Sequence, residues 1–232
     1  MKVVANEKSI KRFRSIGNFA LIGSLVIIGV GFYLLLKSNS MSWGVITMAA
    51  SFLLSQIGIF FGNRFGVQPP LYEQISQSLK GLENKYTLYH YNTSVPHLLV
   101  GPSGLWIIVP FIQKGNMRFD TKKNRWKQEK VSWFAKIFMQ EGLGRPDQEV
   151  DAYVKDISKD LKKVFGEQEI PEVKPVIIFT NPKSEINTDD APVPAMHIKK
   201  LKDFLRQQSK TIALSEEQLT KLKNALPEPE ES

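Results

Sequence analysis

Two apolar segments without any charge lie close together near the start of the chain, and they constrain its structure more than any other feature. The first runs from Ile16 to Leu36 and the second from Trp43 to Asn63. A helix of about 20 apolar residues crosses a hydrocarbon core of about 30 Å. A cleaved signal sequence has an apolar core of only about 7–15 residues, followed by small residues. The sequence therefore predicts two membrane-spanning helices, 16–36 and 43–63, joined by a short connection into an antiparallel hairpin.

Positive charge is concentrated beside this hairpin. The chain has a net charge of +8, and residues 1–69 account for +6 of it. Five basic residues precede the first apolar segment, whereas the hairpin loop contains only Lys37. Since Lys and Arg are enriched in cytoplasmic flanks, we expect 1–15 to be a basic cytoplasmic N-terminus of a cell-membrane protein. Two spans then return the chain to the cytoplasm, and the basic flank is suited to anionic lipid headgroups.

Small residues recur along one face of the second apolar segment, where close helix packing would need them. The set that falls on this face is Gly44, Thr47, Ser51, Ser55, Gly58 and Gly62. Small side chains let helix backbones approach closely in lipid. The face predicts packing on the first helix of the same hairpin, with homodimerisation as the alternative. Neither span contains an ionisable residue, which favours an anchor over a transport path.

The rest of the chain alternates between strand and helix signals after a linker at 64–70. Helical spacing of apolar residues covers 71–84 and 146–165, and β-rich runs cover 86–91, 97–100, 105–109 and 173–180. Gly101-Pro102-Ser103-Gly104 predicts a hairpin turn, and a second hairpin is expected over 117–128. A short strand at 196–198, a helix at 199–207 and a helix capped by Ser215 follow, before an acidic tail at 227–232. This order predicts an α/β domain over 71–226, an α+β mixed sheet flanked by helices.

The stretch from Val95 to Ile108 resembles the nuclease-related domain (NERD) family, whose pattern there is close to "iDHvlvgpsGvfvIevKn". Gly115, Trp126, Pro146 with Gln148, and the strand 176–181 also match, so that the resemblance covers about 71–226. It implies a restriction-endonuclease-like fold and a domain that is often attached to membrane spans.

The resemblance also implies where catalytic residues should be found, and this chain departs from the family at each position. The family's Asp falls on Pro96, its Glu on Val109 and its Lys on Phe111. Mg²⁺ needs hard oxygen ligands, and these apolar side chains supply none. We therefore expect no bound metal, no cofactor and no enzymatic activity, but a degenerate domain that acts as a binding or scaffolding module. Two alternatives remain: a metal-dependent nuclease that uses non-standard positions, and a membrane-tethered nucleic-acid-binding protein.

A basic segment with interleaved aromatic residues follows the first predicted hairpin of the domain. Its candidate contact residues are Lys122, Lys123, Arg125, Trp126, Lys127, Trp133 and Phe134. Three interpretations fit: a solvated hairpin whose aromatic residues pack on the sheet, contact with an anionic membrane surface, and nucleic-acid binding. The lipid bilayer is the favoured partner over nucleic acid, and the stretch 133–139 is the best candidate for entering the interface. The chain has no cysteine, which removes disulfides and thiolate chemistry.

Overall fold

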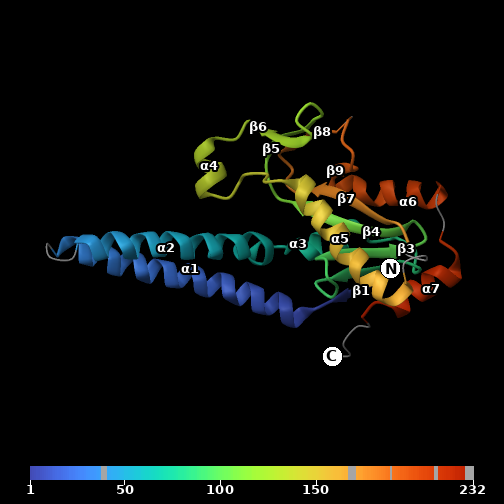
Figure 1. Ribbon diagram of the computed structural model, residues 1–232, viewed down its shortest axis with the longest axis horizontal. Helices are drawn as coiled ribbons and strands as arrows, with labels where there is room; N and C mark the ends of the chain where they lie inside the picture. The colour runs from blue at the N-terminus through green and yellow to red at the C-terminus, as the bar shows by residue number, and fades with distance from the viewer. Residues whose placement is uncertain (38–40, 167–170, 189, 212–213, 228–232) are drawn as a thin grey trace. The chain divides into compact units, whose positions relative to one another are not determined.

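The computed structural model describes residues 1–37, 41–166, 171–188, 190–211 and 214–227 (Figure 1). The chain divides into two compact units. The sheet unit contains residues 1–6, 72–132 and 141–232, and the hairpin unit contains residues 7–71 and 133–140. The chain therefore passes between the units four times, and each unit is built from segments that are distant in sequence.

The hairpin unit is formed by two long apolar helices and two short elements. Helix α1 (Glu7–Leu36) lies antiparallel beside α2 (Met41–Phe61), which continues into the π-helix η2 (Gly62–Gly66). Both long helices are long and apolar enough to span a membrane. The short helix α4 (Trp133–Phe138) belongs to the same unit, although almost 70 residues separate it from η2.

The sheet unit contains a six-stranded mixed sheet in the order β1-β2-β3-β4-β7-β9. The strands are β1 (Lys2–Ala5), β2 (Thr87–His90), β3 (His97–Gly101), β4 (Gly104–Phe111), β7 (Val173–Phe179) and β9 (Ala195–His197). Strands β2, β3 and β4 form an antiparallel meander, while β1, β7 and β9 pair in parallel with their neighbours. Gly104, at the β3–β4 turn, has φ of +109°, a conformation that favours glycine.

Helices cover both faces of this sheet, because its central strands are apolar on both sides. On one face, Ile107 and Val109 pack with residues of α5 (Pro146–Phe165) and α7 (Glu216–Asn224). On the other face, Trp106 and Ile108 pack with α3 (Leu71–Ser78) and α6 (Leu201–Thr211), which follows a 3₁₀ turn (Ile198–Lys200). The mixed α/β class predicted from the sequence is confirmed.

A small second sheet has the order β6-β5-β8. Strand β5 (Gly115–Asp120) pairs antiparallel with β6 (Arg125–Glu129) and parallel with β8 (Ser184–Asn187). Its buried residues Met117 and Trp126 join the core on the α5 face of the large sheet.

Three local expectations differ from the structure. Residues 2–5 form strand β1 instead of a free basic flank, and α1 begins at Glu7, nine residues before the apolar segment. Strand β8 follows β7 where the sequence predicted no strand. The acidic tail expected at 227–232 lies outside the described residues, except for Pro227.

Candidate functional site

The two long helices pack through small residues that repeat every seven positions. On α1 the buried positions include Gly17, Ser24 and Gly31, and on α2 they are Gly44, Ser51 and Gly58. A seven-residue repeat keeps one stripe of each helix facing its neighbour. The Ser51 hydroxyl donates a hydrogen bond to the Ser24 carbonyl across this seam, at 2.7 Å.

The small residues singled out from the sequence differ in how they face α1. A Cβ added to Gly58 would lie 2.6 Å from the Leu21 side chain, so Gly58 is needed for the close approach of α1. The backbone of Gly62 also lies against α1, because a Cβ added to Gly17 would come 3.3 Å from the Gly62 nitrogen, but a Cβ on Gly62 itself would meet nothing within 4 Å. Ser55 donates its hydroxyl hydrogen bond to the Phe52 carbonyl within its own helix.

The outer surface of the hairpin is apolar on all sides. Phe19 is 72% exposed and Leu25 is 70% exposed, far more than large apolar side chains in a water-soluble core. Further exposed apolar residues occur along both helices: Ile22, Val26, Val30, Phe32, Leu36, Trp43, Val45, Ile46, Leu53 and Ile57. Exposed apolar surface of this extent marks a site of interaction with apolar material.

Helix α4 contacts α2 through one aromatic pair and one polar pair. The rings of Phe138 and Phe52 lie 5.7 Å apart in an edge-to-face arrangement. The Gln140 side-chain amide donates hydrogen bonds to the Gln56 carbonyl at 2.8 Å and to the Gln56 side-chain oxygen at 3.0 Å. The remaining aromatic surface of α4 is open, with Trp133 69% exposed and Phe134 53% exposed.

The basic residues predicted to contact membrane or nucleic acid lie at the β5–β6 turn in the sheet unit. Lys122, Lys123 and Arg125 are exposed there. Lys127 pairs with Asp120, whose pKa is lowered mainly by the hydrogen bond from that lysine. Trp126 is only 5% exposed, and its ring packs against Phe119 and Phe179 in the core, as in the interpretation of a solvated hairpin whose aromatic residues pack on the sheet.

The positions that correspond to the family's catalytic residues lie on β4 and just before β3. Val109 and Phe111 are both buried in the core on the α5 face, and the Phe111 ring lies 5.9 Å from that of Phe179. The antiparallel pairing of β3 with β4 begins at Leu98 and Ile107, and Pro96 lies two residues before Leu98. Two of the three positions therefore belong to the packed interior of the sheet.

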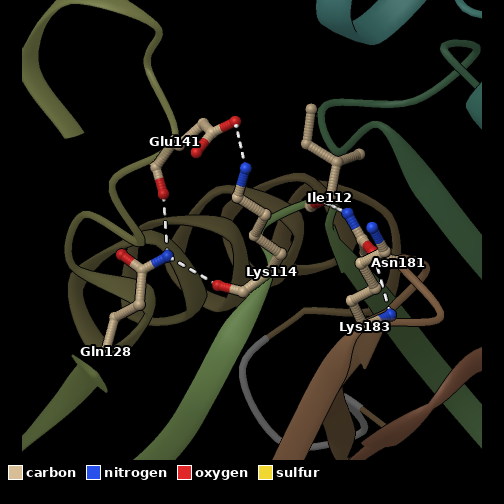
Figure 2. A network of polar contacts seen from close by, with 6 residues as sticks. All are labelled: Ile112, Lys114, Gln128, Glu141, Asn181 and Lys183. Carbon is tan, nitrogen blue, oxygen red and sulfur yellow. Dashed lines mark hydrogen bonds and ion pairs between the residues drawn. The ribbon is translucent and has the colours of Figure 1, made fainter. Parts of the chain in front are cut away.

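A network of polar contacts surrounds the end of β4 (Figure 2). Lys114 pairs with a Glu141 carboxylate oxygen at 2.9 Å, and the Gln128 amide donates to the main-chain oxygens of both residues. Asn181 donates to the Ile112 carbonyl at 3.1 Å and accepts a hydrogen bond from the main chain of Lys183. These contacts connect the β4–β5 loop with the β7–β8 loop through Asn181, and with the segment that precedes α5 through Glu141.

This network contains one carboxylate, and that carboxylate is already neutralised by Lys114. Its second oxygen, Glu141 Oε2, is buried and has no hydrogen-bond partner within the described parts of the chain. Among those residues, no three His, Cys, Asp or Glu side chains are grouped in a way that could hold a metal ion.

A buried histidine pair forms the most unusual polar contact in the sheet unit. The Nδ1 atoms of His90 and His97 lie 2.8 Å apart, and His90 Nε2 lies 2.9 Å from the Ser76 hydroxyl. Burial lowers the pKa of His90 to about 3, and burial together with His90 lowers the pKa of His97. One ring must donate through Nδ1–H and the other must accept, and because burial lowers the pKa of each ring, both are neutral near pH 7. With so low a pKa, His90 is a poor general base for Ser76.

Sequence reasoning did not identify the Gln140–Gln56 contact or the histidine pair. His90 and His97 carry no metal-ligand spacing, and they become neighbours only through the antiparallel register of β2 and β3. Gln56 is a strongly polar side chain in the middle of the second apolar segment, but its partner is 84 residues away.

No family model matches the chain, and neither the curated proteins nor the solved structures provide a match.

Proposed function

We propose that this protein is a membrane-anchored, non-catalytic module, in which the helical hairpin holds a NERD-like domain at the cytoplasmic face as a binding or scaffolding platform. The observation that carries the proposal is the hairpin surface. Two antiparallel helices bury their small residues against each other and expose large apolar side chains outward. A bilayer provides the apolar surroundings that this arrangement requires.

The chain connectivity indicates that both ends of the hairpin lie on the same side of the membrane. Strand β1, which precedes α1, pairs with β2, which follows α2 and α3. Both ends of the hairpin therefore lead into the same sheet, so an even number of crossings is required. The basic residues Lys8, Lys11, Arg12 and Arg14 occupy the first turns of α1, and this excess supports a cytoplasmic location for the shared side.

The absence of catalysis is proposed from the burial of Val109 and Phe111. A divalent ion at this place on β4 would need carboxylate oxygens inside an apolar core, where an uncompensated charge costs several kcal/mol. The exposed basic turn at Lys122, Lys123 and Arg125 offers instead a surface for anionic partners, with phosphate or carboxylate groups as the matching chemistry.

The anchor and its orientation can be tested in cells with single cysteines, because the chain has none of its own. Lys37→Cys should react with a membrane-impermeant maleimide added outside, whereas Lys8→Cys and Lys122→Cys should react only after permeabilisation. Labelling of Lys122→Cys in intact cells would contradict the cytoplasmic assignment. Release of the protein from membranes by alkaline carbonate would contradict the spanning hairpin.

A second candidate function, a nuclease with non-standard catalytic positions, is favoured by one observation, the Lys114–Glu141 pair at the end of β4. The two functions are separated by incubating the full chain in nanodiscs with plasmid DNA and Mg²⁺ or Mn²⁺. Metal-dependent cleavage that is lost in Glu141→Gln would establish the nuclease. Salt-sensitive DNA binding without cleavage would indicate a nucleic-acid-binding module.

A further inference from the structure

We infer that helix α4 and the two residues after it, Met139 and Gln140, are a third membrane-embedded element, which inserts beside α2 into the hydrocarbon core and contacts lipid acyl chains. This inference rests on the proposed function, because it requires α2 to span the bilayer. It adds that residues 133–140, and not the two long helices alone, enter the hydrocarbon.

The depth of α4 follows from its contacts on α2. Arg64, whose guanidinium lies over the Phe60 ring at 3.9 Å, marks the end of the apolar segment. At 1.5 Å per residue, Gln56 lies roughly 12 Å and Phe52 roughly 18 Å along the helix from Arg64. Half of a hydrocarbon core is about 15 Å. Because Gln140 contacts α2 at the first level and Phe138 at the second, α4 lies inside the hydrocarbon core, close to its midplane, and not above the membrane surface.

Apart from Lys136, the side chains of α4 are apolar, and their exposure fits that depth. A lysine side chain near a helix end extends toward the headgroups. Ile137 is 56% exposed and Met139 is 54% exposed, in addition to the open rings of Trp133 and Phe134. In water, an exposed apolar surface of this kind on a six-residue helix would promote aggregation. It is continuous with the apolar surface of α2, which the same acyl chains would cover.

The polar groups at this depth are satisfied by each other. Gln140 has a φ of +51°, an uncommon conformation for a side-chain-bearing residue, and this turn directs its amide to Gln56. Gln56, the strongly polar side chain in the middle of the second apolar segment, thus gains a partner, as polar groups inside a membrane generally must. The Gln56–Gln140 pair therefore fixes where α4 is attached along α2.

The test uses the full chain in nanodiscs with a single nitroxide-labelled cysteine at a time. Ile137→Cys and Phe134→Cys should collide more with oxygen, which concentrates in hydrocarbon, than with a water-soluble nickel chelate. Leu53→Cys, exposed on α2, is the matched lipid control, and Lys122→Cys at the β5–β6 turn is the aqueous control. The quantity compared is the ratio of collisions with oxygen to collisions with the nickel chelate. Adding Gln140→Ala to the Ile137→Cys variant should shift this ratio toward that of the aqueous control and leave the ratio at Leu53→Cys unchanged.

The controls separate failure of this inference from failure of the proposed function. An aqueous ratio at Ile137→Cys and Phe134→Cys, with Leu53→Cys still in lipid, would overturn the insertion of α4 while the anchor stands. An aqueous ratio at Leu53→Cys would overturn the spanning hairpin itself. A ratio at Ile137→Cys that does not respond to Gln140→Ala would overturn the role of the glutamine pair.

Discussion

Acidification should destabilise the sheet unit through the buried His90–His97 pair, well above the pH at which carboxylates titrate. Burial lowers the folded-state pKa of both rings, to about 3 for His90, against about 6.5 in an unfolded chain. The unfolded chain therefore takes up protons first as the pH falls. The contribution of the pair to stability is complete above about pH 6.5 and is lost progressively toward about pH 3.

The size of this effect follows from the shift. Each histidine that protonates only in the unfolded chain lowers the free energy of unfolding by about 1.4 kcal/mol per pH unit below 6.5. At about pH 4.5, His90 alone removes about 3 kcal/mol, and His97 acts in the same direction. A loss of this size is a large fraction of the 5–15 kcal/mol typical of a domain.

The assay is urea unfolding of the full chain in nanodiscs, followed by the fluorescence of Trp106 and Trp126, both buried in the sheet unit. We expect the free energy of unfolding to fall between pH 6.5 and 5 with an uptake of one to two protons. The matched control is His197→Gln, a half-buried histidine outside the pair, which should keep this slope.

His90→Gln should lower the slope if it folds. If it does not fold, a titration of the histidine ring resonances of the unmodified chain tests the same point. An unfolding free energy that stays constant between pH 6.5 and 5 would refute the reasoning. Resonances of two histidines that titrate near their ordinary pKa in the folded chain would refute it as well.

Three further predictions concern packing, capping and the core. Gly58→Ala should destabilise the hairpin by about 1–3 kcal/mol, because its new methyl group meets Leu21, whereas Gly62→Ala should be neutral; thermal unfolding in detergent compares the two. Ser215→Ala should lower the stability of the chain by about 1 kcal/mol, since it removes the capping box of α7, and urea unfolding measures this loss. Val109→Glu should destabilise the sheet unit by about 3 kcal/mol or more, beyond the loss in Val109→Ala, without producing metal-dependent DNA cleavage.

Local sequence signals predicted the elements whose structure is decided locally. The Gly101–Gly104 turn set the β3–β4 hairpin, Ser215 and Gln218 formed the expected capping box, and apolar spacing located α5 at 146–165. Strand β1 could not be found in this way, because its four residues become a strand only by pairing with β2, more than 80 positions later. The polar sequence of β8 likewise becomes a strand only through β5.

The candidate sites show the same division between local pattern and distant contact. The basic segment with interleaved aromatic residues resembled one continuous surface in the sequence. Its parts belong to two units, however, with Trp126 in the core of one and Trp133 exposed in the other. Alternation along β6 is short and interrupted by charges, so periodicity alone did not show that Trp126 faces inward. The contact between Gln56 and Gln140 carries no local signal at all.

Stability and metal binding compete for the same positions on β4, and this competition gives the non-catalytic proposal its physical basis. Val109 and Phe111 alternate with Ile108 along a strand that is buried on both faces, so each contributes to a packed layer. A carboxylate at Val109 would be tolerated only with a cation and further oxygen ligands beside it. Phe111 instead places an aromatic ring next to Phe179, which completes the apolar contact. Because an active site would have to replace several such contacts together, single substitutions on β4 should lose stability before they gain chemistry.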